Sequence, residues 1–562
     1  MNIIRILVLG LSLLFIISCN NEASDKITAS STAMETSDTL VPDSSNEGLK
    51  NALQAHIEFL ADDRLKGRNT GSDEYEIAAR YVASHFKQFG LKSAGENDSW
   101  FQSVPFTKST PDSSAAEMIL HTKDIDRAFS FPEQFLSGAS AISEADVVTG
   151  KVVFVGYGIV SKELKHDDYS GLDVKGKIVA YLAGKPASFP SEQGAHLSSG
   201  SEKKRHAAER GAIAIITMHT PLRDKVRTYE KTITYAGLPS LNWQLKEGGV
   251  FGNYPGIRGS AYIPVETGKA MFSAAGYDLD KVFKEIEADN IPLGFEMDIN
   301  VTLKRKSSHQ NIASSNVVGI LEGSDPALKN EYLVYSAHLD HIGDESHTEG
   351  DDHINNGALD NASGIAIMLE TARRFSQGER PKRSILFIAV TGEEKGLLGS
   401  NFFAHYPTVP VESIIANINL DMPLILYPFA DVIAFGAQHS TMAGFVERAA
   451  ALENLKLSPD PMPEQAIFVR SDHYSFVKQG IPSIFLVPGF TSKDPEIDGA
   501  KVFGEFFAKH YHQPSDDTTL PINYDAGATF TIVNFNIGAE IANSKTRPHW
   551  NEGDYFGDIF KQ

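Results

Sequence analysis

The chain of 562 residues is long enough for several hydrophobic cores, because one domain typically holds roughly 100–200 residues. Hydrophobic residues make up 42% of it and charged residues 22%, which is typical of a globular protein and excludes a disordered or collagen-like chain. Its 72 acidic residues outnumber 51 basic ones, and the formal charge is −21. We find no basic cluster, and we therefore exclude a nucleic-acid partner, because binding phosphates requires a basic surface.

The amino terminus, MNIIRILVLGLSLLFIISCNN, has an early Arg5, a short apolar segment and a small residue before Cys19. This pattern predicts a secretion signal over residues 1–19 rather than a membrane-spanning helix. The run IISC resembles the lipobox of bacterial lipoproteins. The resemblance implies lipidation of Cys19, which would anchor the chain to a membrane of the bacterial cell envelope, facing the periplasm or the exterior. The alternative is an ordinary cleaved signal with an incidental cysteine.

Residues 20–48 are rich in Ser, Thr, Asp and Glu, and we predict a flexible linker. Helical periodicity follows, with acidic residues at its start and Gly90 after its end. The apolar positions of this predicted helix are Ile77, Tyr81, Val82, Phe86 and Phe89.

A second region contains GKVVFVGYGI, DDYSGLDVKGKIVAYLAG and KKRHAAERGAIAIITM. These are short runs rich in β-formers, separated by glycines, together with one Ala-rich helix. The region holds no cluster of residues suited to catalysis. It is followed by the alternating run GFEMDINVTLKR, which is typical of a half-buried strand.

The remaining chain alternates apolar runs with helical segments. The runs are YLVYSA, SILFIAV, SIIANINL, DVIAFG and PSIFLV, and the helical segments include ASGIAIMLETARRF and TMAGFVERAAALENL. This alternation predicts an α/β fold with a largely parallel sheet covered on both faces. In such sheets ligands bind beyond the carboxyl ends of the strands.

Residues able to bind metals lie at these strand ends. They are His338, Asp340 and Asp360, then the adjacent pair Glu393 and Glu394, then Asp421, and finally His512 near the carboxyl end. Two adjacent carboxylates repel each other, and a bound cation would offset that repulsion. Imidazole and carboxylate ligands suit zinc, although other divalent ions accept them too. One member of the glutamate pair can bind an ion while the other stays free to accept a proton from water.

With these motifs, the region from about Leu49 to Ser544 resembles the co-catalytic zinc peptidases of metallopeptidase family 28. That family includes secreted aminopeptidases, glutamate carboxypeptidase, glutaminyl cyclases and the transferrin-receptor ectodomain. The resemblance implies a three-layer α/β/α catalytic domain with a mixed, largely parallel sheet, over residues 49–140 and 301–545. It also implies a β-rich protease-associated domain inserted over residues 141–300. A tail covers residues 546–562.

The resemblance also implies two zinc ions and a role for each motif residue. His338 and Asp421 would bind one ion, Glu394 and His512 the other, and Asp360 both, while Asp340 would orient the His338 imidazole. Glu393 would be the general base, Tyr511 would stabilise the oxyanion, and Arg470 would contact the substrate. We expect His341, His347, His353 and His473 to be loop residues or residues that contact the ligands.

These roles predict an aminopeptidase that hydrolyses peptide bonds at a free amino terminus, with peptides as its partners. A carboxypeptidase or dipeptidase of the same family is one alternative, although it would need cationic groups for a terminal carboxylate and the motif loops offer mainly Arg470. Glutaminyl cyclases use one zinc, whereas both ligand pairs are present here. A receptor-like binding module would be expected to have lost ligands.

Overall fold

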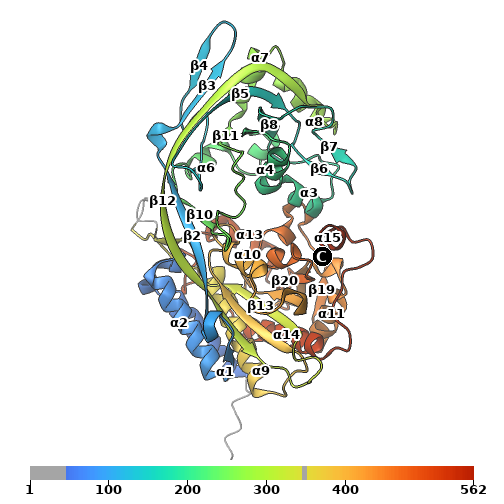
Figure 1. The fold of residues 1–562 in the computed structure, drawn as a ribbon. Coiled ribbons are helices and arrows are strands. Elements are labelled where there is room, and N and C mark those ends of the chain that lie inside the picture. Colours follow the sequence, from blue (N-terminus) through green and yellow to red (C-terminus); the bar gives the residue numbers. More distant parts are fainter. Residues whose placement is uncertain (1–45, 345–350, 562) are drawn as a thin grey trace, which may run out of the picture. The chain divides into compact units, whose positions relative to one another are not determined.

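The two largest hydrophobic cores are connected by one strand, β12 (Phe295–Leu321), which contributes to both. The structure is a computed structural model that describes residues 46–344 and 351–561. The first half of β12 pairs with β3 (Glu117–His121) and β5 (Ala145–Phe154), and its second half pairs with β2 (Phe101–Pro111) (Figure 1). The predicted signal peptide, Cys19, the linker up to residue 45 and His347 lie outside the described residues. No helix within the described ranges is long and apolar enough to cross a membrane.

The sheet of the larger core confirms the predicted mixed, largely parallel arrangement. Its strands run in the order β12, β16, β13, β17, β20, β18, β19. Parallel pairing joins β13 to β16 and β17, β17 to β20, and β18 to β19, whereas β12 pairs antiparallel with β16 and β18 pairs antiparallel with β20. The bounds are β13 (Tyr332–His338), β16 (Ser384–Val390), β17 (Ile414–Asn419), β18 (Asp431–Phe435), β19 (Lys456–Ser458) and β20 (Ser483–Pro488). Two short strands, β1 (Lys92–Ser93) and β10 (Ser240–Trp243), pair with β12 and β2.

Helices cover both faces of this sheet, and the alternation of side chains along β13 shows why. Leu333 and Tyr335 point into the main core, whereas Val334 points into a smaller core on the opposite face. Strands buried on both faces are mostly apolar, and these strands are, apart from buried polar residues such as Ser336, Asn417 and Asn419. The main core is covered by α1 (Asn46–Leu60), α2 (Asp73–Gln88), α9 (Ser363–Gln377), α11 (Met442–Leu452) and α14 (Tyr524–Asn543), and the opposite face by α10 (Leu398–His405) and α12 (His473–Val477).

Helix α2 matches the helix predicted around residues 77–89, with one difference. Ser72 caps it by accepting a hydrogen bond from the Tyr75 backbone N–H, and its acidic first turn complements the helix dipole. Val82 and Phe86 are fully buried as expected, but Ile77 is 50% exposed. Instead of Ile77, the buried stripe includes Tyr75 and two alanines one turn further along.

The second large core lies around the other half of β12. Here β5, β8, β9 and β11 form parallel pairs, and helices of the same segment flank them. This core includes Met118, Phe129 and Phe135, which precede residue 140, so it recruits part of the segment that we predicted to belong to the catalytic domain. The limits 141–300 and the protease-associated identity remain predictions. The bounds are β4 (Asp126–Phe129), β6 (Val160–Ser161), β7 (His166–Asp167), β8 (Ile178–Leu182), β9 (Ala214–Met218), β11 (Gly259–Ile263), α3 (Ser191–Ser198), α4 (Gly200–Glu209), α5 (Pro221–Asp224), α6 (Tyr229–Ile233), α7 (Val265–Ala274) and α8 (Leu279–Glu287).

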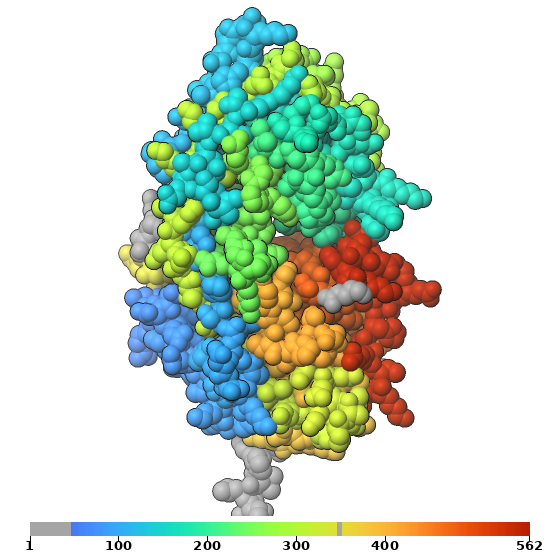
Figure 2. Space-filling model, viewed as in Figure 1, coloured from blue at the N-terminus to red at the C-terminus, as the bar shows by residue number. Residues whose placement is uncertain are grey.

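Strand β10 returns from the second region to pair with β2, and its Trp243 is buried there in a small cluster with Val104, Phe106 and Phe402. The Trp243 ring stacks on Phe251 with 4.2 Å between centroids, and its Nε1–H donates to Asn401 Oδ1 at 3.1 Å. It also contacts Phe402 in α10. In the space-filling view, green chain near residue 245 lies against the orange surface of α10 (Figure 2). The two regions are therefore tied together by burial of an aromatic side chain as well as by β12.

Helix α3 forms a second contact with the larger region, beside the predicted tail. His439 lies between two carboxylates: its Nε2 is 2.8 Å from Glu192 Oε2 of α3, and its Nδ1 is 2.6 Å from Asp554 Oδ2 of the tail. Phe556 in α15 (Tyr555–Ile559) is buried against the same histidine. The teal surface of the second region meets the red tail at this place in Figure 2. The tail therefore docks onto the domain, and α3 also lies against the segment from Pro463 to Val469.

The charge of His439 predicts a pH-dependent contribution to stability. Burial lowers the pKa of His439, but Asp554 and Glu192 outweigh burial and raise it from 6.5 to about 9. The stabilisation is therefore complete below pH 6.5 and is lost as the pH rises through 9. We expect His439→Leu to cost about 1–3 kcal/mol at acidic pH, the loss of hydrogen bonds to charged groups. Thermal unfolding of the wild-type protein and His439→Leu across this pH range should show that the difference in their stability becomes smaller as the pH rises. A stability difference that grows with pH would contradict the charged state assigned to His439.

Candidate metal centre

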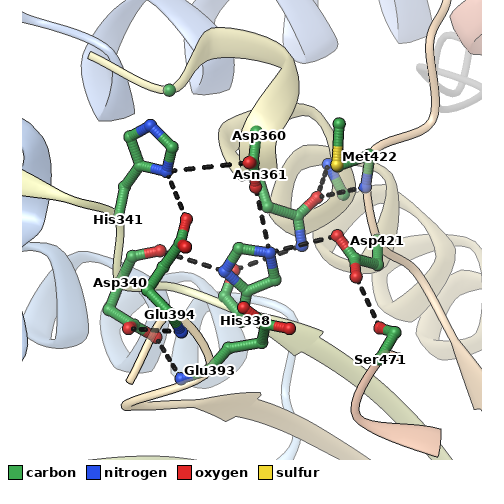
Figure 3. Close-up of polar contacts among 12 residues, drawn as sticks. His338, Asp340, His341, Asp360, Asn361, Glu393, Glu394, Asp421, Met422 and Ser471 are labelled. Atoms are coloured by element: carbon green, nitrogen blue, oxygen red, sulfur yellow. Dashed lines mark hydrogen bonds and ion pairs between the residues drawn. The ribbon is translucent and has the colours of Figure 1, made fainter. Parts of the chain in front are cut away.

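The candidate metal-binding residues converge at the carboxyl ends of neighbouring parallel strands (Figure 3). His338 is the last residue of β13, Glu393 and Glu394 lie in the turn after β16, and Asp421 follows β17. Asp360 lies in the short helical segment η4 (Ala358–Ala362), which leads into α9. Adjacent parallel strands end at the same edge of a sheet, and residues far apart in the sequence therefore become neighbours here.

Asp360 divides the site into two halves, because its two oxygens face different partners. Its Oδ1 is 3.2 Å from His338 Nε2, which is in turn 3.1 Å from Asp421 Oδ1. Its Oδ2 is 3.4 Å from His512 Nε2, which is in turn 3.2 Å from Glu394 Oε2. His512 follows α13 (Gly499–Lys509) by three residues. The structure thus brings all five predicted metal ligands together.

These separations fit zinc. Ligand atoms about 2.0–2.2 Å from a tetrahedral zinc ion lie roughly 3.3–3.5 Å from one another. The four distances given above, two of which involve Asp360, are close to that range. Each half of the site combines an imidazole nitrogen with carboxylate oxygens, a donor set that zinc prefers. A carboxylate whose oxygens serve separate ligand pairs has the form of a bridge between two ions.

The adjacent glutamates have opposite electrostatic environments. Burial raises the pKa of Glu393 well above its ordinary value, and Asp421 and Glu394 raise it further. Burial also raises the pKa of Glu394, but His341 and His512 outweigh burial and hold it at about 2. Glu394 is therefore suited to bind a cation, whereas Glu393 is suited to accept and hold a proton.

Asp340 occupies a different position from the one predicted for it. The His338 Nδ1 atom lies 3.0 Å from the backbone carbonyl oxygen of Asp340, and the Asp340 carboxylate does not contact the ring. That carboxylate instead accepts hydrogen bonds from the backbone N–H of Glu393 at 3.1 Å and from the Thr70 hydroxyl at 2.9 Å. Asp340 thus holds the turn that carries both glutamates, and its backbone orients the imidazole.

Two side chains that the sequence did not reveal fix the position of Asp360. Asn361 Oδ1 accepts the backbone N–H of Met422 at 3.1 Å, and its Nδ2 donates to the Leu420 carbonyl at 2.9 Å. The Asp516 carboxylate accepts the Asp360 N–H at 3.0 Å. The motifs DNASG and HQPSDD contain these residues, but only the folded chain shows that they connect three loops.

A pocket of about 100 Å³ opens beside the two halves of the site. That volume suits a single side chain, since sites for larger ligands are typically ~300–1,000 Å³. Tyr511 lines it and stacks on His512 with 3.8 Å between ring centroids, and burial raises the Tyr511 pKa above its ordinary value. Arg470 lies on the wall, exposed, and forms no ion pair with any described residue. The apolar wall is formed by Met422, Phe435, Ile467, Phe485, Val487, Phe503 and Phe507.

The other predicted histidines differ in position. His341 is fully buried and contacts Glu394. His473 is also buried, but it packs against Phe468 and Phe485 rather than against the carboxylates. His353 is described at the end of the polar loop.

The fold and the site define a chain with a zinc-peptidase-like α/β domain, and a comparison with known protein families agrees with this class. The model of "Peptidase family M28" matches residues 316–536, so this part of the chain is similar to that family.

Related proteins cover parts of the chain. It is 27% identical over 292 residues to "probable leucine aminopeptidase 2" of Aspergillus oryzae, covering 49% of this chain and 54% of that protein. It is 29% identical over 217 residues to "Aminopeptidase YwaD" of Bacillus subtilis, covering 38% and 42%. The chain therefore matches about half the length of these curated relatives or less. The structure of an aminopeptidase from Aneurinibacillus sp. strain AM-1 superposes with a TM-score of 0.51 at 20% identity, over 90% of this chain and 97% of that one, which shows a shared fold.

Metal binding should release protons from the site. Burial lowers the pKa of His512, but Asp360 and Glu394 outweigh burial and raise it to about 10, so the metal-free imidazole is charged near neutral pH. A ligating imidazole must be neutral, and zinc therefore displaces that proton. Calorimetric titration with zinc in buffers of different ionisation enthalpy should show a net proton release, and affinity that falls as the pH falls. Heats that do not depend on the buffer would contradict this protonation state.

Proposed function

We propose that this protein is a zinc-dependent aminopeptidase that uses two zinc ions to hydrolyse the peptide bond next to a free amino terminus. The observation that carries the proposal is the division of Asp360 between two ligand pairs, His338 with Asp421 and His512 with Glu394. The similarity to peptidase family M28 and the names of the matched relatives support the same activity.

Two zinc ions bound in this site would polarise the scissile carbonyl and lower the pKa of the attacking water. Glu393 would accept a proton from that water and deliver it to the leaving amine, and its raised pKa suits both transfers. The Tyr511 hydroxyl, in the same pocket, would donate a hydrogen bond to the carbonyl oxygen as negative charge develops there. Asp340 would keep Glu393 in place through its backbone N–H.

The charge around the pocket favours binding of an amino terminus over a carboxyl terminus. Arg470 is the one cationic side chain among its lining residues apart from the histidines, so the pocket offers little to hold a carboxylate. A carboxypeptidase or dipeptidase would rely on Arg470 alone to hold a carboxylate. The complete set of ligands favours an enzyme over a receptor-like module.

We also propose that the chain is a lipoprotein, anchored through Cys19 in a bacterial cell envelope, because IISC has the form of a lipobox. The second core, which packs around β5, β8, β9 and β11, is proposed to be an inserted protease-associated domain. Its contact through α3, which lies against the segment that holds Ile467, would support the pocket wall from outside the catalytic domain.

The amino-terminal polarity can be tested with a peptide and its N-acetylated twin, incubated with the zinc-loaded protein and followed by mass spectrometry. We expect residues to leave only the amino end of the unblocked peptide. Glu393→Gln should lower kcat about 100- to 10,000-fold, the contribution of general base catalysis, while zinc content stays the same. Glu379→Gln, which changes an exposed glutamate, serves as the matched control.

Two outcomes would contradict this proposal in different ways. Removal of residues from the carboxyl end of both peptides would show that the enzyme is a carboxypeptidase, while the assignment of the catalytic site would stand. Full activity of Glu393→Gln would remove Glu393 from the proton transfers.

The apolar wall predicts a preference for peptides that begin with a large apolar residue. Ile467→Ala would enlarge the pocket, and we expect kcat/KM for leucine-initiated peptides to fall roughly 10- to 100-fold, the range for lost methylene contacts, with a smaller change for alanine-initiated peptides. Ile291→Ala, at an exposed isoleucine, is the control. Equal losses for both peptide classes would show that Ile467 does not line the specificity pocket.

A further inference from the structure

Glu394 is contacted by two imidazoles, one at each carboxylate oxygen. His512 Nε2 lies 3.2 Å from Oε2, and His341 Nδ1 lies 2.7 Å from Oε1 (Figure 3 shows His341). We propose that His341 is a positioning residue for the second zinc ion: its Nδ1–H donates to Glu394 Oε1 and thereby directs Oε2 toward the ion. The inference rests on the two-ion site proposed above.

The distances distinguish a hydrogen-bond donor from a metal ligand. A separation of 2.7 Å is that of a charge-assisted hydrogen bond, and it is shorter than the roughly 3.3 Å expected between two ligands of one tetrahedral zinc. His341 Nδ1 is also 3.9 Å from Asp360 Oδ2, farther than His512 Nε2 at 3.4 Å. His512 thus has the spacing of a ligand toward both carboxylates, and His341 has the spacing of a donor toward one.

The bond to Glu394 is the one side-chain hydrogen bond of the His341 ring among the described residues, and Asp360 Oδ2 is a more distant ionic contact. The His341 side chain is fully buried, and its Nε2 has no hydrogen-bond partner among the described residues. A buried imidazole with one hydrogen bond is oriented by that bond and in turn orients its partner. Glu394 is the side chain whose position depends on it.

The surrounding backbone prevents the ring from moving away. Gly357 lies against the ring so closely that a Cβ atom there would be 2.7 Å from it. The buried Arg68 guanidinium donates to the carbonyls of Leu339 at 2.9 Å and Asn356 at 2.6 Å, which come shortly before His341 and Gly357 in the chain. The His341 backbone N–H donates to the Arg68 carbonyl at 3.3 Å. The segment before the second region thus fixes the histidine and the glycine together.

Fixing Oε1 has a consequence for metal binding. A carboxylate without this contact can rotate or bind an ion through both oxygens, and Glu394 also faces the like charge of Asp360. With Oε1 held by His341, Oε2 remains beside Asp360 Oδ2 and His512 Nε2, where the second ion would bind. The contact therefore organises one half of the site and leaves His338 and Asp421 unaffected.

Substitutions of His341 separate the possible roles. In His341→Asn the amide nitrogen stands near the position of Nδ1 and can still donate to Glu394, but it is a poor zinc ligand. His341→Gln places its amide near Nε2, beyond reach of Oε1, and His341→Leu removes the donor. His549→Asn, at an exposed histidine, is the matched control. The readout is zinc affinity and stoichiometry, measured by competition with a chromophoric chelator, with thermal unfolding of each metal-free variant.

We expect the wild-type protein and His549→Asn to bind two zinc ions. His341→Leu and His341→Gln should weaken one of them about 10- to 100-fold, the usual effect of removing a group that orients a metal ligand, and leave the other unchanged. His341→Asn should stay within a few-fold of the wild type at both sites. If His341→Leu does not fold, the comparison of Gln with Asn makes the same distinction.

Three results would overturn the inference. An equal loss of zinc affinity in His341→Asn and His341→Gln would mean that a His341 nitrogen is itself a zinc ligand. Unchanged zinc affinity in His341→Leu or His341→Gln would mean that the contact with Glu394 does not affect the ion. A single zinc in the wild-type protein would remove the second site, together with the two-ion form of the proposed function. Two zinc ions with the expected pattern but no peptide cleavage would instead uphold the role of His341 and reject the aminopeptidase.

Discussion

The concentration of carboxylates at the sheet edge is the constraint on which the site depends. Asp340, Asp360, Glu393, Glu394 and Asp421 lie together with little access to solvent, where like charges repel strongly. Imidazoles and the buried guanidinium of Arg68 offset part of that repulsion, and bound divalent cations would offset the rest. The same environment distinguishes two adjacent residues. Glu394, between two histidines, stays ionised, whereas burial raises the pKa of its neighbour Glu393. Two carboxyl groups whose pKa values are separated in this way can perform different steps of acid–base chemistry.

The fold supplies the support that such a cluster requires. Parallel strands bring His338, Asp421 and the glutamate turn to one edge, and α9 begins just beyond Asp360. Chain from before the second region completes the support, since Thr70 holds Asp340 and Arg68 holds the loops around His341. The second region contacts the larger region at Trp243, and α3 and the tail contact it at His439. Helix α3 also lies against the segment that holds Ile467 of the pocket wall. The site therefore depends on segments distributed over most of the described chain.

Much of this could be predicted from the sequence, because buried parallel strands are continuous apolar runs and metal ligands follow them directly. The strands around the site, α2 and the convergence of the five candidate ligands are in this category. The polar second half of β12 gave no strand signal, since its pairing with β2 comes from tertiary structure. Residues that act through buried hydrogen bonds, such as Arg68 and Asp516, were missed for the same reason. The family resemblance implied a contact between Asp340 and His338, but it could not show that the backbone of Asp340 makes that contact.

The central claim is that Asp360 bridges two metal ions. Anomalous diffraction at the zinc edge from crystals grown with zinc tests it most directly. We expect two peaks about 3.5–4 Å apart, one near His338, Asp421 and Asp360 Oδ1, the other near Glu394, His512 and Asp360 Oδ2. A single peak, or two peaks that do not share Asp360, would contradict it.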